Sequence, residues 1–381
     1  MAKERVREVF ESRYGKDYRM FAAPGRINLI GEHTDYNEGF VMPAAIDRRI
    51  YLAISAESGN RASIHSIDYN EDINFDIEGE TQNLPQWALY PYGVVKELQK
   101  QGFMPGGFRA VFAGDIPGGA GLSSSAALEC AFASALNAIF GFGADNFKLA
   151  ITGQMAEHNY AGVKCGIMDQ FASFFGNKDK VIKLDCRTLE YEYFPLELDG
   201  HQLLLADTRV KHSLASSAYN KRRRQCEEGA EIIGRDHPGV KSLRDVTPEL
   251  LRSYRNKLKQ EVYTRCEYVI EENSRVMSTC EALASGSVDK TGELMYQSHK
   301  GLKEKYEVSC QELDLLVSIA AEAGLTGARM MGGGFGGCTI NLLRSEEAES
   351  FREKASAEFS SVFGHPPIFY DVSTGDGAGE I

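Results

Sequence analysis

The sequence predicts an α+β protein built from two domains. Its 381 residues exceed one typical core, because a domain takes roughly 150 residues. Strand-like and helical patterns alternate in the first half, whereas amphipathic helical patterns dominate residues 213–320. We therefore place the domain change near residue 200, with a first domain over 1–200 and a second over 201–381. The closing residues are expected to run back toward the first domain.

The expected elements follow in chain order. The opening residues, MAKERVREVFESRYG, form a charged helical pattern. Residues 107–116 (GFRAVFAGDI) alternate like a strand, PGGAGLSSS breaks that pattern, and AALECAFASALNAIF follows as a helix of small residues. A second pair of strands is expected from 180–198 and 201–208. Glycine-rich turns and strand residues return over 324–343.

Composition and charge favour a small-molecule ligand. The residues are 43% apolar and 25% charged, which suits a globular protein with a sizeable core. The formal charge of -12 argues against broad binding to nucleic acid or to anionic membranes, because both need a positive surface field. An anionic nucleotide would have to be held by local backbone amides and a metal ion.

The cysteines and the absence of export signals predict a cytoplasmic protein. None of the eight cysteines forms a CxxC pair, and none clusters beside histidines, so we expect reduced, mostly buried thiols. The chain has no signal-peptide pattern and no run of about 18 apolar residues. The basic run from Lys221 to Arg224 is expected to be the solvated face of a helix.

The loop from Pro117 to Ser125 (PGGAGLSSS) has the composition of a phosphate-binding loop. Glycine lets the backbone approach an anion closely, and the helix that follows offers unpaired N–H groups and a positive dipole end. It matches neither a Walker A loop nor a dinucleotide-binding fingerprint. A plain glycine turn that caps the helix through Ser123 is an equally good interpretation of the loop alone.

Two further segments concentrate polar residues. Pro24 to Tyr36 (PGRINLIGEHTDY) packs arginine, glutamate, histidine and aspartate around two glycines. These groups either salt-bridge one another or hydrogen-bond the hydroxyls of a sugar. In an extended loop His33 and Asp35, two residues apart, would point the same way. Ala156 to Gln170 (AEHNYAGVKCGIMDQ) presents Glu157 and Asp169, which gain meaning only beside the other two segments.

Together these segments resemble the galactokinase family of the superfamily of galactokinase, homoserine kinase, mevalonate kinase and phosphomevalonate kinase. GRINLIGEHTDY is similar to the galactokinase signature, GGAGLSSSAAL to the superfamily's ATP loop, and GGGFGG to its third motif. CGIMDQ and the terminal GDGAGE also fit, so the resemblance runs from about residue 20 to the end. MPAAI stands where LPMAI is common, a conservative departure.

The resemblance implies a two-domain small-molecule kinase fold, with a first domain like ribosomal protein S5 and a ferredoxin-like second domain. It also implies residue roles, with Asp169 as the base and Arg26 stabilising the transition state. GGGFGG would support the ATP loop, although a tight hairpin between strands explains it equally well. The remaining implied sites are galactose contacts at Glu32, His33, Asp35, Gly166 and Tyr219; nucleotide contacts at Ser66, Gly119, Ala120, Gly121, Leu122, Ser123, Ser124 and Ser125; and magnesium ligands at Ser125 and Glu157.

The implied activity is magnesium-dependent transfer of the ATP γ-phosphoryl group to the C1 hydroxyl of galactose by a monomer. In such chemistry the protein mainly positions reactants and neutralises charge. Two alternatives stay open at this point. One is a kinase for a related sugar such as N-acetylgalactosamine, arabinose or galacturonate, and the other is a non-catalytic sensor of galactose and ATP. The sensor is disfavoured because Ser125, Ala126, Glu157 and Asp169 are all present.

Overall fold

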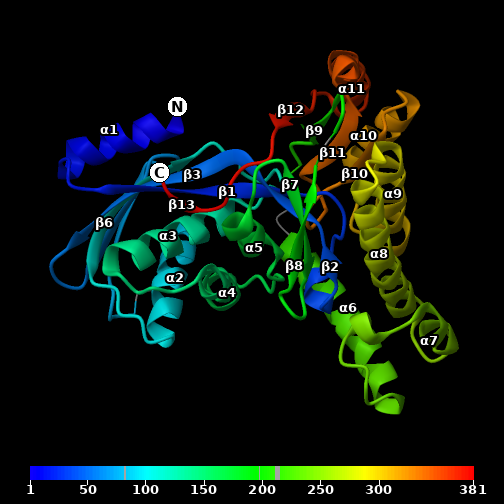
Figure 1. Cartoon of the computed structure of the whole chain (residues 1–381), viewed down its shortest axis with the longest axis horizontal. Helices are drawn as coiled ribbons and strands as arrows, with labels where there is room; N and C mark the ends of the chain where they lie inside the picture. Colours follow the sequence, from blue (N-terminus) through cyan, green and yellow to red (C-terminus); the bar gives the residue numbers. More distant parts are fainter. Residues whose placement is uncertain (81–82, 197, 211–214) are drawn as a thin grey trace.

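The computed structural model describes residues 1–80, 83–196, 198–210 and 215–381 (Figure 1). Residues 213 and 214, where the predicted helical region begins, and Glu197 of a predicted strand segment lie outside the described residues. The α-helices are Ala2–Tyr14 (α1), Leu89–Lys100 (α2), Ser124–Phe140 (α3), Asn146–Ala156 (α4), Met168–Phe175 (α5), Ala215–Asp236 (α6), Pro248–Ser253 (α7), Gln260–Ala284 (α8), Val288–Gly301 (α9), Gln311–Glu322 (α10) and Ala348–Phe363 (α11).

A six-stranded sheet forms the centre of the first half. In spatial order its strands are β13 (Gly379–Glu380), β1 (Arg19–Asn28), β3 (Pro43–Glu57), β6 (Gly107–Gly114), β4 (Arg61–Ser66) and β5 (Glu71–Asp76). Alternate residues face opposite sides. On β3, Ala53 packs under Phe10 of α1, whereas Leu52 and Ile54 face the core that α2 to α5 cover. The predicted strand at 107–116 is β6, and its glycine loop leads into α3.

Two smaller sheets complete the fold. One has the order β10 (Gly327–Met330), β11 (Cys338–Arg344), β9 (His201–Asp207), β12 (Ile368–Val372), and the other has the order β2 (Phe40–Val41), β7 (Lys180–Asp185), β8 (Tyr191–Pro195). The predicted pairing of 180–198 with 201–208 is wrong, because β7 and β8 pair with each other. Asp185 Oδ1 accepts the backbone N–H groups of Arg187 and Thr188 and so closes that hairpin locally.

Strand β9 shows how the two halves join. Leu204 and Ala206 face α10 and α11, whereas Leu203 and Leu205 pack into the same core as β1 and β3. The sheet is therefore buried on both faces, and one hydrophobic core runs through both halves. The domain boundary near residue 200 stays a prediction. The C-terminal strand β13 pairs with β1, so the end of the chain lies beside the first half.

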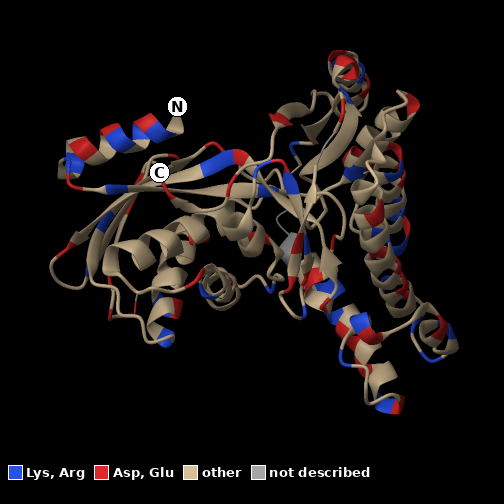
Figure 2. Cartoon of the chain, viewed as in Figure 1, with Lys and Arg blue, Asp and Glu red and all other residues tan. Residues whose placement is uncertain are grey.

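The charged surface is mixed in sign. Lys/Arg and Asp/Glu side chains alternate along α1 and α6, while α3 carries few of them (Figure 2). Lys221 and Arg224 are exposed as predicted, but the prediction is wrong for Arg222, which is buried. Its guanidinium donates to the carbonyl oxygens of Tyr306 and Glu307 at 2.6 and 2.9 Å. Those carbonyls end a helical turn and need a partner from elsewhere.

The thiols match the expectation from composition. All eight cysteines are free, and Cys130, Cys226, Cys266, Cys280 and Cys338 are buried. Within the described ranges, every helix is too short or too polar to span a bilayer.

Buried ionic groups connect the two halves. Arg329 of β10 is fully buried; its Nη2 lies 2.8 Å from Glu32 Oε1, and its Nη1 donates to the Asn28 carbonyl at 3.0 Å. Glu272 of α8, also buried, accepts the Gly31 N–H at 2.9 Å. The turn that follows β1 is therefore held by side chains from the second half of the chain.

We expect Arg329→Met to lower the free energy of unfolding by about 3–5 kcal/mol, because it leaves a buried carboxylate without its partner. Urea denaturation followed by circular dichroism measures this change.

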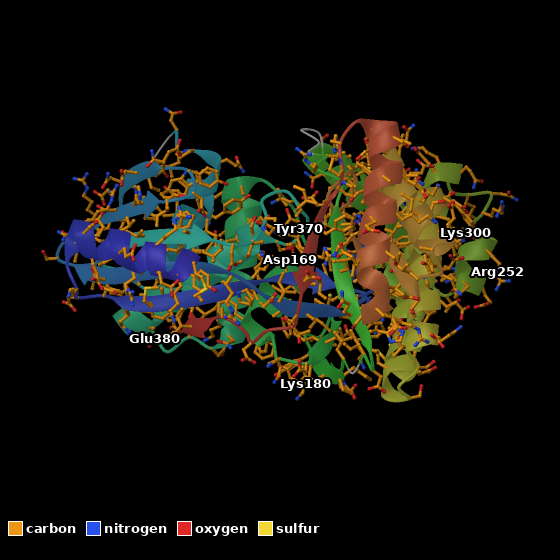
Figure 3. All side chains as sticks on the ribbon, turned by 90° about the horizontal axis from the view of Figure 1, so that it is seen from above. Asp169, Lys180, Arg252, Lys300, Tyr370 and Glu380 are labelled. Atoms are coloured by element: carbon orange, nitrogen blue, oxygen red, sulfur yellow. The ribbon has the colours of Figure 1, made fainter. Side chains whose placement is uncertain are left out.

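The matched control is Arg252→Met. Arg252 is an exposed arginine whose partner Glu249 is also exposed (Figure 3), so its loss should cost no more than about 0.5 kcal/mol. Equal effects of the two substitutions would contradict a structural role for the buried pair.

Candidate active site

The segment from Pro24 to Tyr36 is a strand end followed by a turn rather than one loop. Arg26 lies on β1, which bulges between Pro24 and Arg26. The Arg26 N–H donates to the Leu122 carbonyl at 3.1 Å, and a side chain at Gly25 would come within 2.6 Å of that oxygen. Glycine at position 25 thus allows the strand to touch the glycine loop.

The polar residues after β1 occupy a tight turn. His33 has a positive φ of 62°, and Asp35 begins a 3₁₀ turn, Asp35–Asn37 (η1). The prediction of an extended loop is therefore wrong. His33 and Asp35 nevertheless line the same cavity.

This first cavity has a volume of about 130 Å³ and lies between the two halves of the chain. Helix α6 contributes Tyr219, and the turn between β10 and β11 contributes Gly332. Gly166 is absent from the lining, but a side chain there would overlap the Asp35 carboxylate, so Gly166 lies directly behind Asp35. The lining residues are Arg26, Glu32, His33, Asp35, Glu157, Val163, Cys165, Met168, Asp169, Tyr219, Gly332 and Gly333.

Asp169, in the first turn of α5, is held from two directions. Arg26 Nε donates to its Oδ1 at 2.8 Å, and Ser123 Oγ donates to its Oδ2 at 2.5 Å. Asp169 lies in the middle of the molecule, between the two halves (Figure 3). Ser123 occupies the cap position of α3 but makes no side-chain cap bond. The alternative interpretation, in which Ser123 caps the helix, is therefore wrong, because its hydroxyl donates to Asp169 instead.

His33 is neutral at any ordinary pH. Burial is the main cause that lowers its pKa to about 3, and the positive charges of Arg222 and Arg329 lower it further. Its Nδ1 lies 2.7 Å from the Tyr36 hydroxyl, and its buried Nε2 makes no well-formed hydrogen bond, although the Gly333 backbone lies near the ring. A neutral imidazole with a free nitrogen can exchange one hydrogen bond with a polar ligand.

Two carboxyl groups of the cavity hold their protons unusually well. Burial, followed by repulsion from Asp169, raises the pKa of Asp35 to about 7. The same two causes raise the pKa of Glu157 to about 7. The cavity therefore crowds like charges that hydrogen-bond donors or a cation would relieve.

A second cavity of about 620 Å³ lies on the other side of the glycine loop. Its walls include Tyr69, Trp87 and Tyr90, which sequence reasoning missed; Trp87, the single tryptophan of the chain, was the available signal. The rings of Tyr69 and Trp87 are parallel, with centroids 6.0 Å apart. Ser66, a predicted nucleotide contact, is buried and lines neither cavity; its Oγ accepts the Tyr69 N–H at 3.4 Å.

The glycine loop lies between the cavities. Gly119, Gly121 and Ser123 have positive φ angles, while Ala120 and Leu122 are buried and anchor the loop. Ser124 and Ser125 face the second cavity at the start of α3. The turn between β10 and β11, which carries GGGFGG, packs against this loop, since a side chain at Gly332 would meet the Gly121 carbonyl at 3.4 Å. The third motif is thus both a hairpin turn and a support.

Ser125 and Glu157 meet where the cavities adjoin. Ser125 Oγ lies 3.5 Å from Glu157 Oε1. A hydroxyl and a carboxylate are hard oxygen donors of the kind Mg²⁺ takes together with substrate phosphates, so the residues fit this ion. Within the described ranges no group of three or more His, Cys, Asp or Glu residues forms a metal cluster.

The arrangement, a carboxylate beside a glycine-rich loop between two cavities, is that of a kinase that acts on a small molecule. Family models agree: the "GHMP kinases N terminal domain" matches residues 90–177, "GHMP kinases C terminal" matches 280–361, and "Galactokinase galactose-binding signature" matches 8–56. A crystal structure of mevalonate kinase, 18% identical, covers 94% of this chain and 99% of its own with a TM-score of 0.65, which shows the shared fold.

Closer relatives narrow the class. A galactokinase of Thermosipho africanus is 43% identical over 94% of this chain and 99% of its own length, and one of Clostridium beijerinckii is 38% identical over 98% and 97%. The structure of Lactococcus lactis galactokinase complexed with galactose is 34% identical, covers 99% of both chains and has a TM-score of 0.95. The chain belongs to the galactokinase family. The predicted two-domain α+β kinase fold is confirmed.

We expect Asp35→Asn to stabilise the ligand-free protein at pH 8. The unfolded chain releases the Asp35 proton near pH 4, whereas the folded protein holds it until about pH 7. Between these values the folded state binds more protons, so this group destabilises the fold increasingly as pH rises. Asparagine stays neutral, and the gain at pH 8 should be on the order of 1 kcal/mol or more.

Urea denaturation at pH 4.5 and pH 8 tests this expectation. The gain should be much smaller at pH 4.5, because that pH lies only just above the pKa of Asp35 in the unfolded chain and little of the penalty has yet accumulated. The control Asp199→Asn, at an exposed position, should change the free energy of unfolding by no more than about 0.5 kcal/mol. A gain that is the same at both pH values would contradict the raised pKa of Asp35.

Proposed function

We propose that the protein transfers the γ-phosphoryl group of ATP to the C1 hydroxyl of D-galactose and releases α-D-galactose 1-phosphate and ADP. The observation that carries the proposal is the placement of Asp169. It faces a small polar cavity and is bonded to Ser123 of the glycine loop that separates this cavity from the second one. Membership of the galactokinase family supports the choice of sugar.

In the proposed reaction the C1 oxygen attacks the γ-phosphorus, and the bond from that phosphorus to the β–γ bridging oxygen breaks. The proton of the C1 hydroxyl group passes to Asp169, and Arg26 stabilises charge on the transferred group. Arg26 suits this task because its Nε is bonded to Asp169 and its Nη1 to the Gly121 carbonyl of the loop, at 2.5 Å. One side chain thus touches both the base and the loop.

The sugar is proposed to lie in the first cavity. Glu32, Asp35 and neutral His33 would hydrogen-bond its hydroxyls, and the Tyr219 ring would cover one face. Glu32 Oε1 accepts the Gly332 N–H at 2.8 Å and also lies beside the Arg329 guanidinium. Gly166 would act by leaving room for the Asp35 carboxylate and for the ligand.

The nucleotide is proposed to lie in the second cavity, with its base near Tyr69, Trp87 and Tyr90 and its phosphates along Gly119 to Ser125. Mg²⁺, held by Ser125 and Glu157 with the phosphates, would neutralise charge on the transferred group. We further propose that the protein acts in the cytoplasm as a monomer.

The deciding experiment measures ADP release with saturating Mg²⁺ and ATP across galactose, glucose, N-acetylgalactosamine, arabinose and galacturonate. We expect strong preference for galactose, since buried groups that hydrogen-bond specific hydroxyls reject analogues that lack them by roughly 10⁴-fold. Better use of another sugar would reassign the enzyme to that sugar. If galactose binds but none of the sugars gives ADP release, the non-catalytic sensor is favoured.

Asp169→Asn should bind galactose yet lose turnover by at least about 10²-fold, the scale of general-base catalysis. Calorimetry with galactose and the ADP-release assay separate the two effects. Asp289→Asn, an exposed change on α9, serves as the control. Turnover near the parental rate would remove Asp169 from the role of base.

A further inference from the structure

Three polar side chains from separate helical segments meet beside the proposed metal site. Glu129 comes from α3, Gln170 from α5, and Glu157 from the π turn Glu157–Ala161 (η3) that follows α4. Glu129 and Gln170 are fully buried, and Glu157 is nearly so. Gln170 Nε2 donates to Glu129 Oε2 at 2.8 Å and to Glu157 Oε2 at 3.1 Å.

The orientation of the Gln170 amide follows from these partners. Its nitrogen carries two hydrogens and faces a carboxyl oxygen on each side, and a carboxyl group keeps an accepting oxygen whether or not it is ionised. The amide occupies one oxygen of Glu157, Oε2, which also accepts from Cys165 Sγ at 3.6 Å. The other oxygen, Oε1, is left beside Ser125 Oγ.

This arrangement is a poor one for stability alone. Glu129 Oε1 and Gln170 Oε1 are both buried without a partner, and burying an unpaired polar atom is unfavourable. Burial and the charge of Glu157 raise the pKa of the Glu129 carboxyl well above its ordinary value. Apolar side chains of similar size would fill the same space at lower cost, so packing does not explain these residues.

The amide is also held rigidly and close to the base. A side chain at Gly153 of α4 would come within 3.0 Å of Gln170 Cγ and 3.4 Å of Glu129 Oε2, so the helix backbone closes over the triad. Gln170 directly follows Asp169 on α5. One dipeptide therefore contacts the proposed metal ligand through its second residue and presents the proposed base through its first.

We propose that Gln170, oriented by Glu129, is a positioning residue that holds the Glu157 carboxylate in the orientation that receives the metal ion. The inference rests on the proposed function, because it takes Glu157 as a metal ligand. Glu129 acts only through Gln170, and neither residue touches a substrate. The pair also keeps the metal ligand in register with the helix that carries Asp169.

The test measures binding of the non-hydrolysable analogue AMP-PNP by calorimetry over a Mg²⁺ series and in EDTA. Mg²⁺ is expected to strengthen AMP-PNP binding, and Gln170→Met should raise the Mg²⁺ concentration that gives half of this increase in affinity by about 10–100-fold. This is the usual effect of losing a residue that orients a metal ligand. Affinity for AMP-PNP in EDTA and for galactose should stay at the parental values. Glu129→Met should shift the Mg²⁺ curve in the same direction.

Two further variants separate positioning from general damage. Glu129→Gln should restore the parental curve, because its amide oxygen still accepts from Gln170. The double variant Glu129→Met/Gln170→Met should be no weaker than Gln170→Met alone, since groups that act through one another are not additive. Thr152→Val removes a buried hydroxyl from α4 away from the triad and should leave the curve unchanged.

The failures are distinguishable. Suppose that Mg²⁺ strengthens AMP-PNP binding in the parent and that Gln170→Met needs the same Mg²⁺ concentration as the parent. That result would overturn the positioning role alone. Two other results would also overturn it. One is a shift in Mg²⁺ requirement in the double variant that equals the sum of the two single shifts. The other is a Glu129→Gln variant that needs as much Mg²⁺ as Glu129→Met. If the AMP-PNP affinity of the parent does not change with Mg²⁺ concentration, the metal site and this inference are both overturned. If Gln170→Met does not fold, the comparison of Glu129→Met with Glu129→Gln decides.

Discussion

The ion pair between Arg26 and Asp169 is the contact around which the site is arranged. It joins β1 to α5, and Ser123 adds the glycine loop as a third partner. These bonds can form only if β1 passes directly beneath the loop, which requires the bulge and the missing side chain at Gly25. Helix α3, which follows the loop, and helix α5, which carries Asp169, pack into the same core as β1 and β3.

The second half of the chain completes what the first half begins. It supplies Tyr219 and Gly332 to the first cavity, and Arg329 fixes Glu32 from a fully buried position. The C-terminal tail then returns to brace α5, since the Ala378 N–H donates to the Ser173 carbonyl at 2.7 Å. Helix α5, which carries Asp169, is therefore held by residues from both ends of the chain.

The first cavity confines several acidic side chains. Asp35, Glu157 and Asp169 line the same cavity, and burial followed by repulsion from Asp169 raises the pKa of both Asp35 and Glu157. Such a cluster lowers the stability of the ligand-free fold and is relieved by hydroxyl donors or a cation. This trade of stability for binding also applies to Glu129 and Gln170, whose unpaired oxygens serve no packing purpose.

Local patterns predicted much of the protein. The run of strand, glycine loop and helix over 107–140 was readable because strand alternation and glycine turns act over a few residues. The polar segments were readable too, and their resemblance to one kinase family predicted the fold class. The same patterns did not reveal that the 180–195 segment closes on itself, since alternation is equally compatible with a local or a distant partner strand.

Other features were decided by tertiary structure. Arg222 belongs to a basic run that looks solvated, yet two carbonyls at the end of a distant turn draw it inside. Trp87 and Tyr69 become one wall only when their segments pack side by side. Gln170 lies between two carboxyl groups that come from other helical segments. Sequence determined which residues were available and how the backbone could turn beside them. Which of them met was settled by long-range packing, because distances between remote segments depend on the whole core.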